Sequence, residues 1–170
     1  MESDSPEKLD RVAQIQQEWH RERPELDPSP MGVIGRIHRL GEYLSEEIVV
    51  VYKRHGLGEG EFDVLAALRR AGAPFERAPG ELAQHTMVTT GAMSKRIDRL
   101  EERGLVSRRV SAVDGRARVI ALTGAGRELV DRAVTEHLAN ERRLLDALSP
   151  EDVAALEAVL TRWSLAVENG

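Results

Sequence analysis

The sequence IDRLEERGLVSRRVSAVDGRARVIALTGAG, residues 97–126, contains the pattern that decides the fold. Its first residues continue a helical apolar repeat that Gly104 ends, because glycine readily takes the left-handed conformation that closes many helices. Residues 105–110 and 116–122 then predict two strands, joined by a loop that contains the turn-forming pair Asp114-Gly115. The closing Leu-Thr-Gly-Ala-Gly is expected to begin a long helix. The stretch therefore predicts a helix, a β-hairpin and a second helix.

The residues upstream of the hairpin are expected to form three helices and a loop: helix 59–71, loop 71–79, helix 80–86 and helix 90–103. The last two helices are separated by the turn Thr86–Thr89, which is the spacing of a helix-turn-helix. With the hairpin as its wing, the module at 57–123 predicts a winged helix-turn-helix, in a fold that is mainly α with a small β-hairpin.

Long amphipathic helices are expected on both sides of this module, over 31–55, 124–147 and 150–168. A small central module cannot cover all of their apolar faces. The surplus predicts a homodimer whose interface is built by residues 31–56 and 124–170, the N- and C-terminal dimerisation helices.

Residues 1–30 are expected to form an additional helix and a linker. Ser5 followed by proline is typical of a helix start and predicts a helix over 6–22. Three prolines between residues 24 and 30 predict a stiff connection to the next helix.

Charge is distributed unevenly along a chain whose net charge is −5. Residues 89–118 have a local net charge of +4, so the remainder carries −9. The eight cations of this segment are Lys95, Arg96, Arg99, Arg103, Arg108, Arg109, Arg116 and Arg118. Such a distribution favours a protein that touches DNA with one face, although a solvated charged surface would have the same composition.

Composition excludes several other classes of protein. The 170 residues contain no cysteine, which rules out disulfides, zinc-thiolate sites and thiol redox sensing. No apolar run reaches the length of about 18 residues that a transmembrane helix needs, and the N-terminus lacks a signal-peptide pattern. We therefore expect a cytoplasmic protein without membrane contact.

Residues 97–126 resemble the signature of the MarR family of bacterial transcriptional regulators. In that family Leu-Glu-x-x-Gly-Leu-Val at the end of the recognition helix leads into a wing with Asp-x-Arg, and the wing closes on Leu-Thr-x-x-Gly. The matching residues are Leu100–Val106, Asp114–Arg116 and Leu122–Gly126. The resemblance implies a dimeric regulator, a repressor by family default, that binds double-stranded DNA.

The recognition helix is expected to enter the major groove with its N-terminus first, because its dipole and free amides favour phosphates there. The candidate contacts on its first turns are Thr89, Thr90, Ser94 and Lys95. Arg99, one turn further on, is expected to reach the flanking phosphates. The alternative is that either threonine only caps the helix and that Arg99 is simply solvated.

The wing supplies the other DNA contacts. Arg116 resembles the family arginine that inserts into the minor groove, Asp114 would orient it, and Arg118 would assist from the adjacent strand. Arg108 and Arg109 alternate faces, so one of them is expected to be structural. A two-fold dimer predicts a pseudo-palindromic operator with half-sites about 10 bp apart.

The additional N-terminal helix resembles the urate-responsive branch of the family, the HucR and PecS type. That resemblance implies a pocket for a small purine-like anion formed by Trp19, Asp63, Arg70 and Arg96. Asp63 and Arg70 are seven residues apart and so share one helix face. Trp19 would stack on a flat ligand, Arg70 would pair with its charge, and Asp63 would otherwise hold Arg96.

Three alternatives remain at this point. A phenolic or lipophilic ligand at the dimer interface would leave Trp19 as packing only. A protein that binds DNA without sequence preference would have a similar basic module. An enzyme is disfavoured, because the sequence has no nucleotide-binding loop, no metal-spaced histidine pair and no nucleophile elbow, and we expect neither cofactor nor metal.

Overall fold

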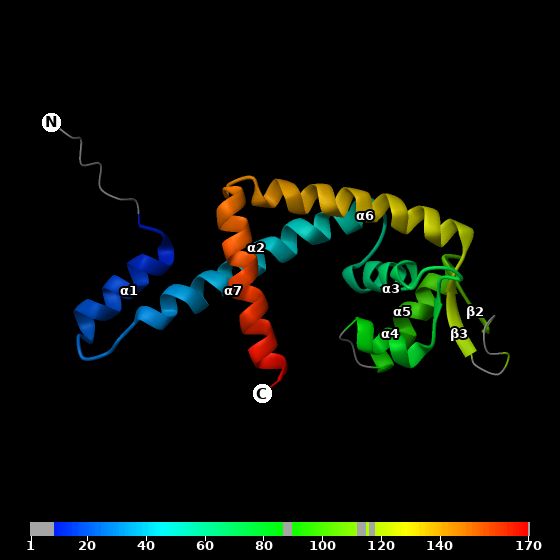
Figure 1. Cartoon of the computed structure of the whole chain (residues 1–170), viewed down its shortest axis with the longest axis horizontal. Coiled ribbons are helices and arrows are strands. Elements are labelled where there is room, and N and C mark those ends of the chain that lie inside the picture. Colours follow the sequence, from blue (N-terminus) through cyan, green and yellow to red (C-terminus); the bar gives the residue numbers. More distant parts are fainter. Residues whose placement is uncertain (1–8, 87–89, 112–114, 116–117, 170) are drawn as a thin grey trace. The chain divides into compact units, whose positions relative to one another are not determined.

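The computed structural model describes residues 9–86, 90–111, 115 and 118–169 (Figure 1). The helices in this part of the chain are α1 (Arg11–Glu22), α2 (Ser29–Arg54), α3 (Glu59–Arg70), α4 (Pro79–His85), α5 (Thr90–Glu102), α6 (Gly124–Leu145) and α7 (Pro150–Glu168). The strands are β1 (Glu76–Arg77), β2 (Val106–Val110) and β3 (Arg118–Leu122). None of the described helices is long and apolar enough to span a membrane. The chain divides into two compact units, Met1–Glu46 and Glu47–Gly170, with the boundary inside α2.

The first unit corrects the expected start of the N-terminal helix. The helix begins at Arg11 rather than at residue 6, and Asp10 is its N-cap, accepting a hydrogen bond from the Ala13 N–H at 2.8 Å. The same carboxylate pairs with Arg36 of α2 at 2.7 Å, so one side chain both caps α1 and ties it to the next helix. The predicted cap, Ser5, lies outside the described residues.

The winged-helix core of the second unit is centred on α3. Seven of the twelve residues of this helix are buried, and they pack against α5, α6 and β3. Larger members of the core from outside α3 are Leu57, Leu82, Met93, Leu100, Ile120 and Val130. The apolar side chains of α3 thus hold α5, α6 and β3 together.

Three residues of the stretch 97–126 have clear local structural roles. Gly104 has φ +67° and ends α5, with the Leu105 N–H donating to the Leu100 carbonyl at 2.9 Å. Thr123 is the N-cap of α6 and accepts from the Gly126 N–H at 3.0 Å. A Cβ on Gly126 would lie 1.9 Å from the Leu105 carbonyl oxygen, so only glycine fits there.

The wing belongs to a three-stranded antiparallel sheet with the order β1-β3-β2, not to an isolated hairpin. The third strand, β1, lies inside the segment 71–79 that the sequence predicts as a loop. Phe75 turns the chain into β1 with φ +61°, and its carbonyl accepts from the Leu122 N–H at 3.0 Å. A strand of two residues is too short to show an alternating pattern, which is why it escapes sequence analysis.

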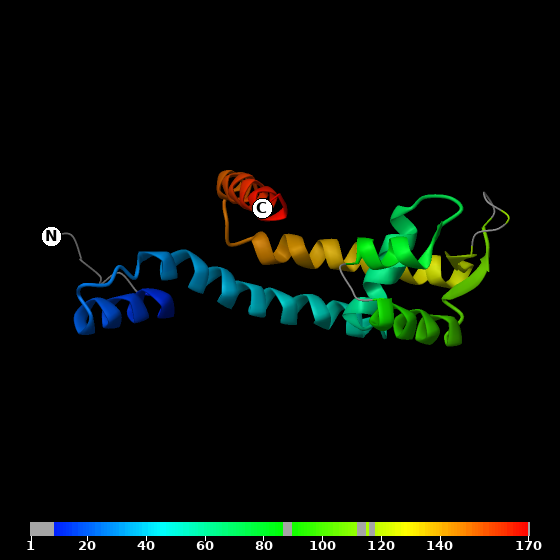
Figure 2. The same cartoon turned by 90° about the horizontal axis from the view of Figure 1, so that it is seen from below.

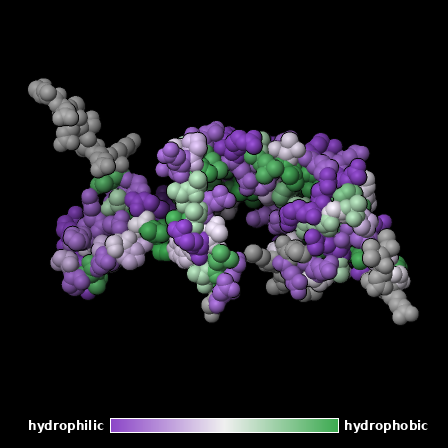
Figure 3. Space-filling view, viewed as in Figure 1, coloured by the Kyte–Doolittle hydropathy of each residue, from purple (hydrophilic) through white to green (hydrophobic). Residues whose placement is uncertain are grey.

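The two C-terminal helices differ in their packing. Helix α6 buries Val130 and Ala133 against the core, and Asn140 donates to the Glu47 carbonyl at 3.3 Å. Helix α7 follows the end of α6, is seen nearly end-on in Figure 2, and has no buried residue. Its apolar side chains form part of the hydrophobic surface in Figure 3.

Candidate functional site

Helix α5 has one buried face and one exposed face. Met93, Ile97 and Leu100 turn into the core, whereas Ser94 and Lys95 are exposed on its second turn. Lys95 has no ion pair within the described part of the chain. Helix α5 therefore presents a polar and cationic surface close to its N-terminus, which is suited to a phosphate backbone.

Several predicted contacts cannot be placed beside this surface. Thr89, Asp114 and Arg116 lie outside the described residues. Thr90 is the first residue of α5, but its side chain is also outside the description. Arg118 opens β3 and is exposed, without an ion pair to any described residue.

The side of α5 that faces α3 is held by a buried carboxylate. Glu61 accepts from Arg99 at 3.0 Å and from Arg103 at 3.3 Å, and its other bond is to the Gly58 N–H at 3.0 Å. Burial alone would raise the pKa of Glu61, but these three donors outweigh burial and hold it below its usual range. Glu61 thus fixes α5 against the first turn of α3.

This arrangement is not evident from the sequence. The sequence predicts that Arg99 contacts phosphate or is solvated, whereas the structure gives Arg99 an acidic partner while 57% of its side chain stays exposed. The only sequence signal for Glu61 is its place three residues after Gly58, as in a capping box. That spacing predicts a helix start but not a partner 38 residues away in the chain.

The opposite side of α5 is bonded to the wing. The Arg108 guanidinium of β2 binds both Asp98 and Glu101, and the Arg108 N–H donates to Glu101 at 3.0 Å. The hydrogen bond with Asp98 is the main cause that raises the pKa of Arg108. Strand β2 and helix α5 are therefore joined through both side-chain and backbone bonds.

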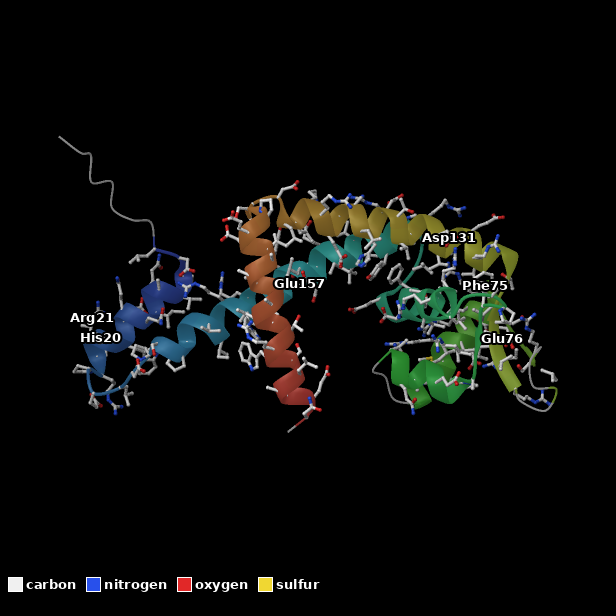
Figure 4. The ribbon with its side chains drawn as sticks, in the orientation of Figure 1. His20, Arg21, Phe75, Glu76, Asp131 and Glu157 are labelled. Atoms are coloured by element: carbon white, nitrogen blue, oxygen red, sulfur yellow. The ribbon has the colours of Figure 1, made fainter. Side chains whose placement is uncertain are left out.

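Arg109, the next residue, is bonded in the other direction. It pairs with Glu76 of β1 at 2.9 Å, and the Ser111 hydroxyl donates to the same carboxylate at 2.8 Å. Glu76 lies at the base of the wing (Figure 4), and only 6% of its side chain is exposed. The alternation of Arg108 and Arg109 predicts that one of them is structural, whereas both have carboxylate partners.

These bonds reduce the basic surface that composition predicts. Four of the eight cations in residues 89–118 are paired with carboxylates: Arg99, Arg103, Arg108 and Arg109. Glu61 and Glu76, which supply two of the partners, come from outside that segment. Of the cations with described side chains, Lys95 and Arg118 remain exposed without an ion pair.

Three of the four predicted effector residues lie on α3 or cross it. Asp63 and Arg70 lie on α3, and Arg96 of α5 crosses Gly60, where an added Cβ would be 2.0 Å from the arginine Cζ. The absence of a side chain at Gly60 is what lets the guanidinium approach α3. Trp19 belongs to the first unit, on α1, with 45% of its surface exposed.

The expected bond between Asp63 and Arg96 is not formed as a salt bridge among the described residues. Their charges do interact: burial and then Glu59 raise the pKa of Asp63, while Arg96 and Arg70 act to lower it. The net effect raises the pKa of Asp63, so the two arginines do not fully offset the cost of burying its negative charge.

An aromatic cluster that sequence analysis missed borders Asp63. The rings of Tyr52 and Phe62 stack with centroids 4.0 Å apart, and the His137 ring lies 5.4 Å and 5.2 Å from them. Burial, together with the negative charge of Asp63, raises the pKa of Tyr52 well above its usual value. Asp63 therefore interacts electrostatically with two arginines and with Tyr52 and His137 of the aromatic cluster. The described residues include no group of histidine and acidic side chains able to hold a metal ion.

Comparison with known proteins gives the chain clear relatives. The model of the MarR family matches residues 55–117. The chain is 38% identical over 151 residues to the HTH-type transcriptional regulator PecS of Dickeya dadantii, covering 89% of this chain and 91% of PecS. It is 33% identical to the HTH-type transcriptional repressor Rv2887 of Mycobacterium tuberculosis, over 72% of this chain and 85% of Rv2887.

Solved structures agree with these sequence matches. Sco5413, a MarR family transcriptional regulator from Streptomyces coelicolor, superposes with a TM-score of 0.69 at 26% identity, covering 83% of this chain and 96% of Sco5413. The complex of Rv2887 with p-aminosalicylic acid superposes with a TM-score of 0.61 at 27% identity, covering 78% of this chain and 98% of that one.

Proposed function

The chain belongs to the MarR family of transcriptional regulators, and on that premise we propose that it is a homodimeric repressor released from its operator by a small aromatic anion. The observation that carries this proposal is the α5 surface, where Ser94 and Lys95 are exposed on a helix bonded to the wing. Urate or a related purine is the effector that we propose first.

In the proposed complex, α5 lies in the major groove and the wing reaches the adjacent minor groove. The major-groove and phosphate contacts are assigned to Thr89, Thr90, Ser94, Lys95 and Arg99. Arg99 stays in this set because more than half of its side chain is exposed beside Glu61. The wing contacts are assigned to Asp114, Arg116 and Arg118. Two winged helix-turn-helix modules related by a dimer axis would require half-sites about 10 bp apart.

The proposed dimer interface combines residues 31–56 and 124–170, which flank the DNA-binding module at 57–123. It is supported by apolar side chains that are exposed in the single chain. On α7 these are Leu156, Val159, Leu160, Trp163 and Leu165, and on α2 they are Met31, Val33, Ile34, Ile37 and Leu40. Apolar surfaces of this kind are typical of interfaces that form with folding.

The proposed effector site uses Asp63, Arg70, Arg96 and Trp19. An anion paired with Arg70 would repel Asp63 and draw Arg96 away from its position over Gly60. Because Arg96 is part of α5, its displacement would move the recognition helix relative to α3. A coupling free energy of about 1–3 kcal/mol would weaken DNA binding about 5- to 150-fold.

A second candidate effector is an aromatic acid bound near the dimer interface. It is supported by Rv2887, a relative whose structure holds p-aminosalicylic acid. The first unit also contains a mainly apolar groove of about 620 Å³, lined in part by Val12, Ile15, Met31 and Ile34. In this alternative Trp19 contributes packing alone.

The test is fluorescence anisotropy on DNA from upstream of the protein's own gene, at one salt concentration, with and without urate or p-aminosalicylate. Nanomolar binding that urate weakens supports the purine site, and Trp19→Phe and Arg70→Gln should then lose the response. Arg69→Gln is the matched control, because its guanidinium bonds Asp131 of α6 at 2.6 Å. A response to p-aminosalicylate alone, unchanged in Arg70→Gln, favours the second candidate. If the protein shows no preference for any DNA sequence, the proposal that it is a repressor is refuted.

A further inference from the structure

The wing is bonded to helix α5 through side chains of both elements. Asp98 and Glu101 are three residues apart on α5 and so lie on one face of the helix, where both bind the guanidinium of Arg108. Glu101 also accepts the Arg108 N–H at 3.0 Å. We call Arg108, Asp98 and Glu101 the wing clamp.

The wing clamp is one of two attachments of the same strand. Arg109 and Ser111, on the other face of β2 and its extension, bind Glu76 of β1. Strands β1 and β2 are not neighbours, and Glu76 reaches across β3 beside the small side chain of Ala121. Figure 4 shows Glu76 at the base of the wing. Strand β2 is thus fixed to α5 by one face and to β1 by the other.

The acidic half of the wing clamp is electrostatically unfavourable for DNA binding. DNA binding depends on neutralising phosphates, and each carboxylate near the backbone opposes that. Asp98 and Glu101 stand on the helix proposed to enter the groove, and 55% of the Asp98 side chain is exposed. Because Arg108 neutralises only one of the two acids, the wing clamp keeps a net negative charge that opposes DNA binding, and the benefit that offsets this cost must lie elsewhere.

We propose that the wing clamp sets the position of the wing relative to the recognition helix, and so makes the protein recognise a defined spacing between a major-groove and a minor-groove contact. Arg108 is then a positioning residue for sequence specificity, not a phosphate contact. This inference rests on the proposed function, because it requires a protein that distinguishes one DNA sequence from others.

The deciding variant is the double substitution Asp98→Asn with Glu101→Gln, which keeps the shapes and the acceptor for the Arg108 N–H while removing both charges. Two duplexes serve as probes. One is the consensus that the wild-type protein selects from random duplexes, and the other has the same bases in shuffled order. We expect affinity for the consensus to fall about 3- to 30-fold while affinity for the shuffled duplex rises.

Four further variants separate positioning from direct contact. Lys95→Gln, a proposed phosphate contact, should weaken both duplexes and lower the slope of log K against log salt by about 1. Arg108→Gln should lower the affinity for the consensus without changing that slope. Arg108→Lys should recover only part of the lost affinity. Arg132→Gln removes an exposed cation of α6 and should change neither duplex.

The outcomes are distinct. Opposite changes on the two duplexes, with unchanged thermal unfolding, support the wing clamp as a positioning device. Equal losses on both duplexes, a lower salt slope for Arg108→Gln, or tighter consensus binding by the double variant would overturn it. If the wild type selects no consensus at all, the proposed function fails first, and the inference fails with it.

Discussion

Helices α3 and α7 belong to the same unit and show opposite relations to it. In α3 seven of twelve residues are buried, including a carboxylate, whereas in the nineteen residues of α7 none is buried. Both helices have clear apolar repeats, so periodicity does not distinguish them. The difference teaches that α3 is stabilised by packing within its own chain, whereas α7 leaves its apolar side chains exposed in the single chain.

The largest expected effect tests this contrast directly. Leu65 of α3 is fully buried, so Leu65→Ala should cost about 2–5 kcal/mol of unfolding free energy in lost transfer energy and a new cavity. Leu160 of α7 is 41% exposed, so Leu160→Ala should act only through association, as a midpoint that depends on protein concentration.

Chemical denaturation of the two variants at several protein concentrations measures both effects. An equal and concentration-independent loss for Leu160→Ala would mean that α7 is packed within its own chain.

The next effect concerns the partner of α7. Trp163 is 40% exposed in the single chain, and large aromatic residues commonly dominate interfaces. We expect Trp163→Asp to raise the dimer dissociation constant more than about 30-fold, since a hot spot contributes about 2 kcal/mol or more. Sedimentation equilibrium measures the constant, and Arg162→Asp, one residue away on a different side of α7, is the control. Unchanged association in Trp163→Asp would place the dimer interface outside α7.

The same contrast separates what the sequence predicts from what it leaves out. Gly104, and Thr123 with Gly126, act within a few residues of themselves, so a linear motif identifies the end of α5 and the start of α6. The helices are present within about two residues of the expected bounds, except for α1, which begins five residues late.

The partners of the cations were not predictable in this way. Glu61 meets Arg99 across 38 residues, and Glu76 meets Arg109 across 33. Such pairs depend on how helices and strands pack, and a local charge count over 89–118 cannot include them. The charge count of residues 89–118 therefore overestimates the exposed positive charge of that segment.

A smaller effect probes the buried carboxylate of α3. Glu61→Gln should cost about 1–2 kcal/mol at neutral pH, because the charge-assisted bonds to Arg99 and Arg103 weaken while both arginines keep partial access to water. The folded state holds the Glu61 pKa below its ordinary 4.5. The stabilisation is therefore complete above that value and is lost as pH falls through the lower folded pKa.

Urea titrations from pH 3 to 7 on the wild type and Glu61→Gln measure this difference. Glu128→Gln, which removes an exposed acid of α6 that has no ion pair among the described residues, is the control. A gap between wild type and Glu61→Gln that stays constant down to pH 3 would contradict the assignment.

The smallest change in stability is expected at Gly60. Alanine there would place its Cβ 2.0 Å from the Arg96 Cζ, whereas alanine at Gly126 would meet a backbone oxygen at 1.9 Å. A guanidinium at the end of a flexible side chain can move aside, but backbone cannot. Gly60→Ala should therefore keep the unfolding free energy within about 0.5 kcal/mol, while Gly126→Ala loses far more. Arg96 would nevertheless be displaced from α3, so urate should no longer change the anisotropy of the DNA complex. If Gly60→Ala retains the full urate response, the position of Arg96 over α3 contributes to packing alone. Helix α3 would then contribute to the core but not to the response to the effector.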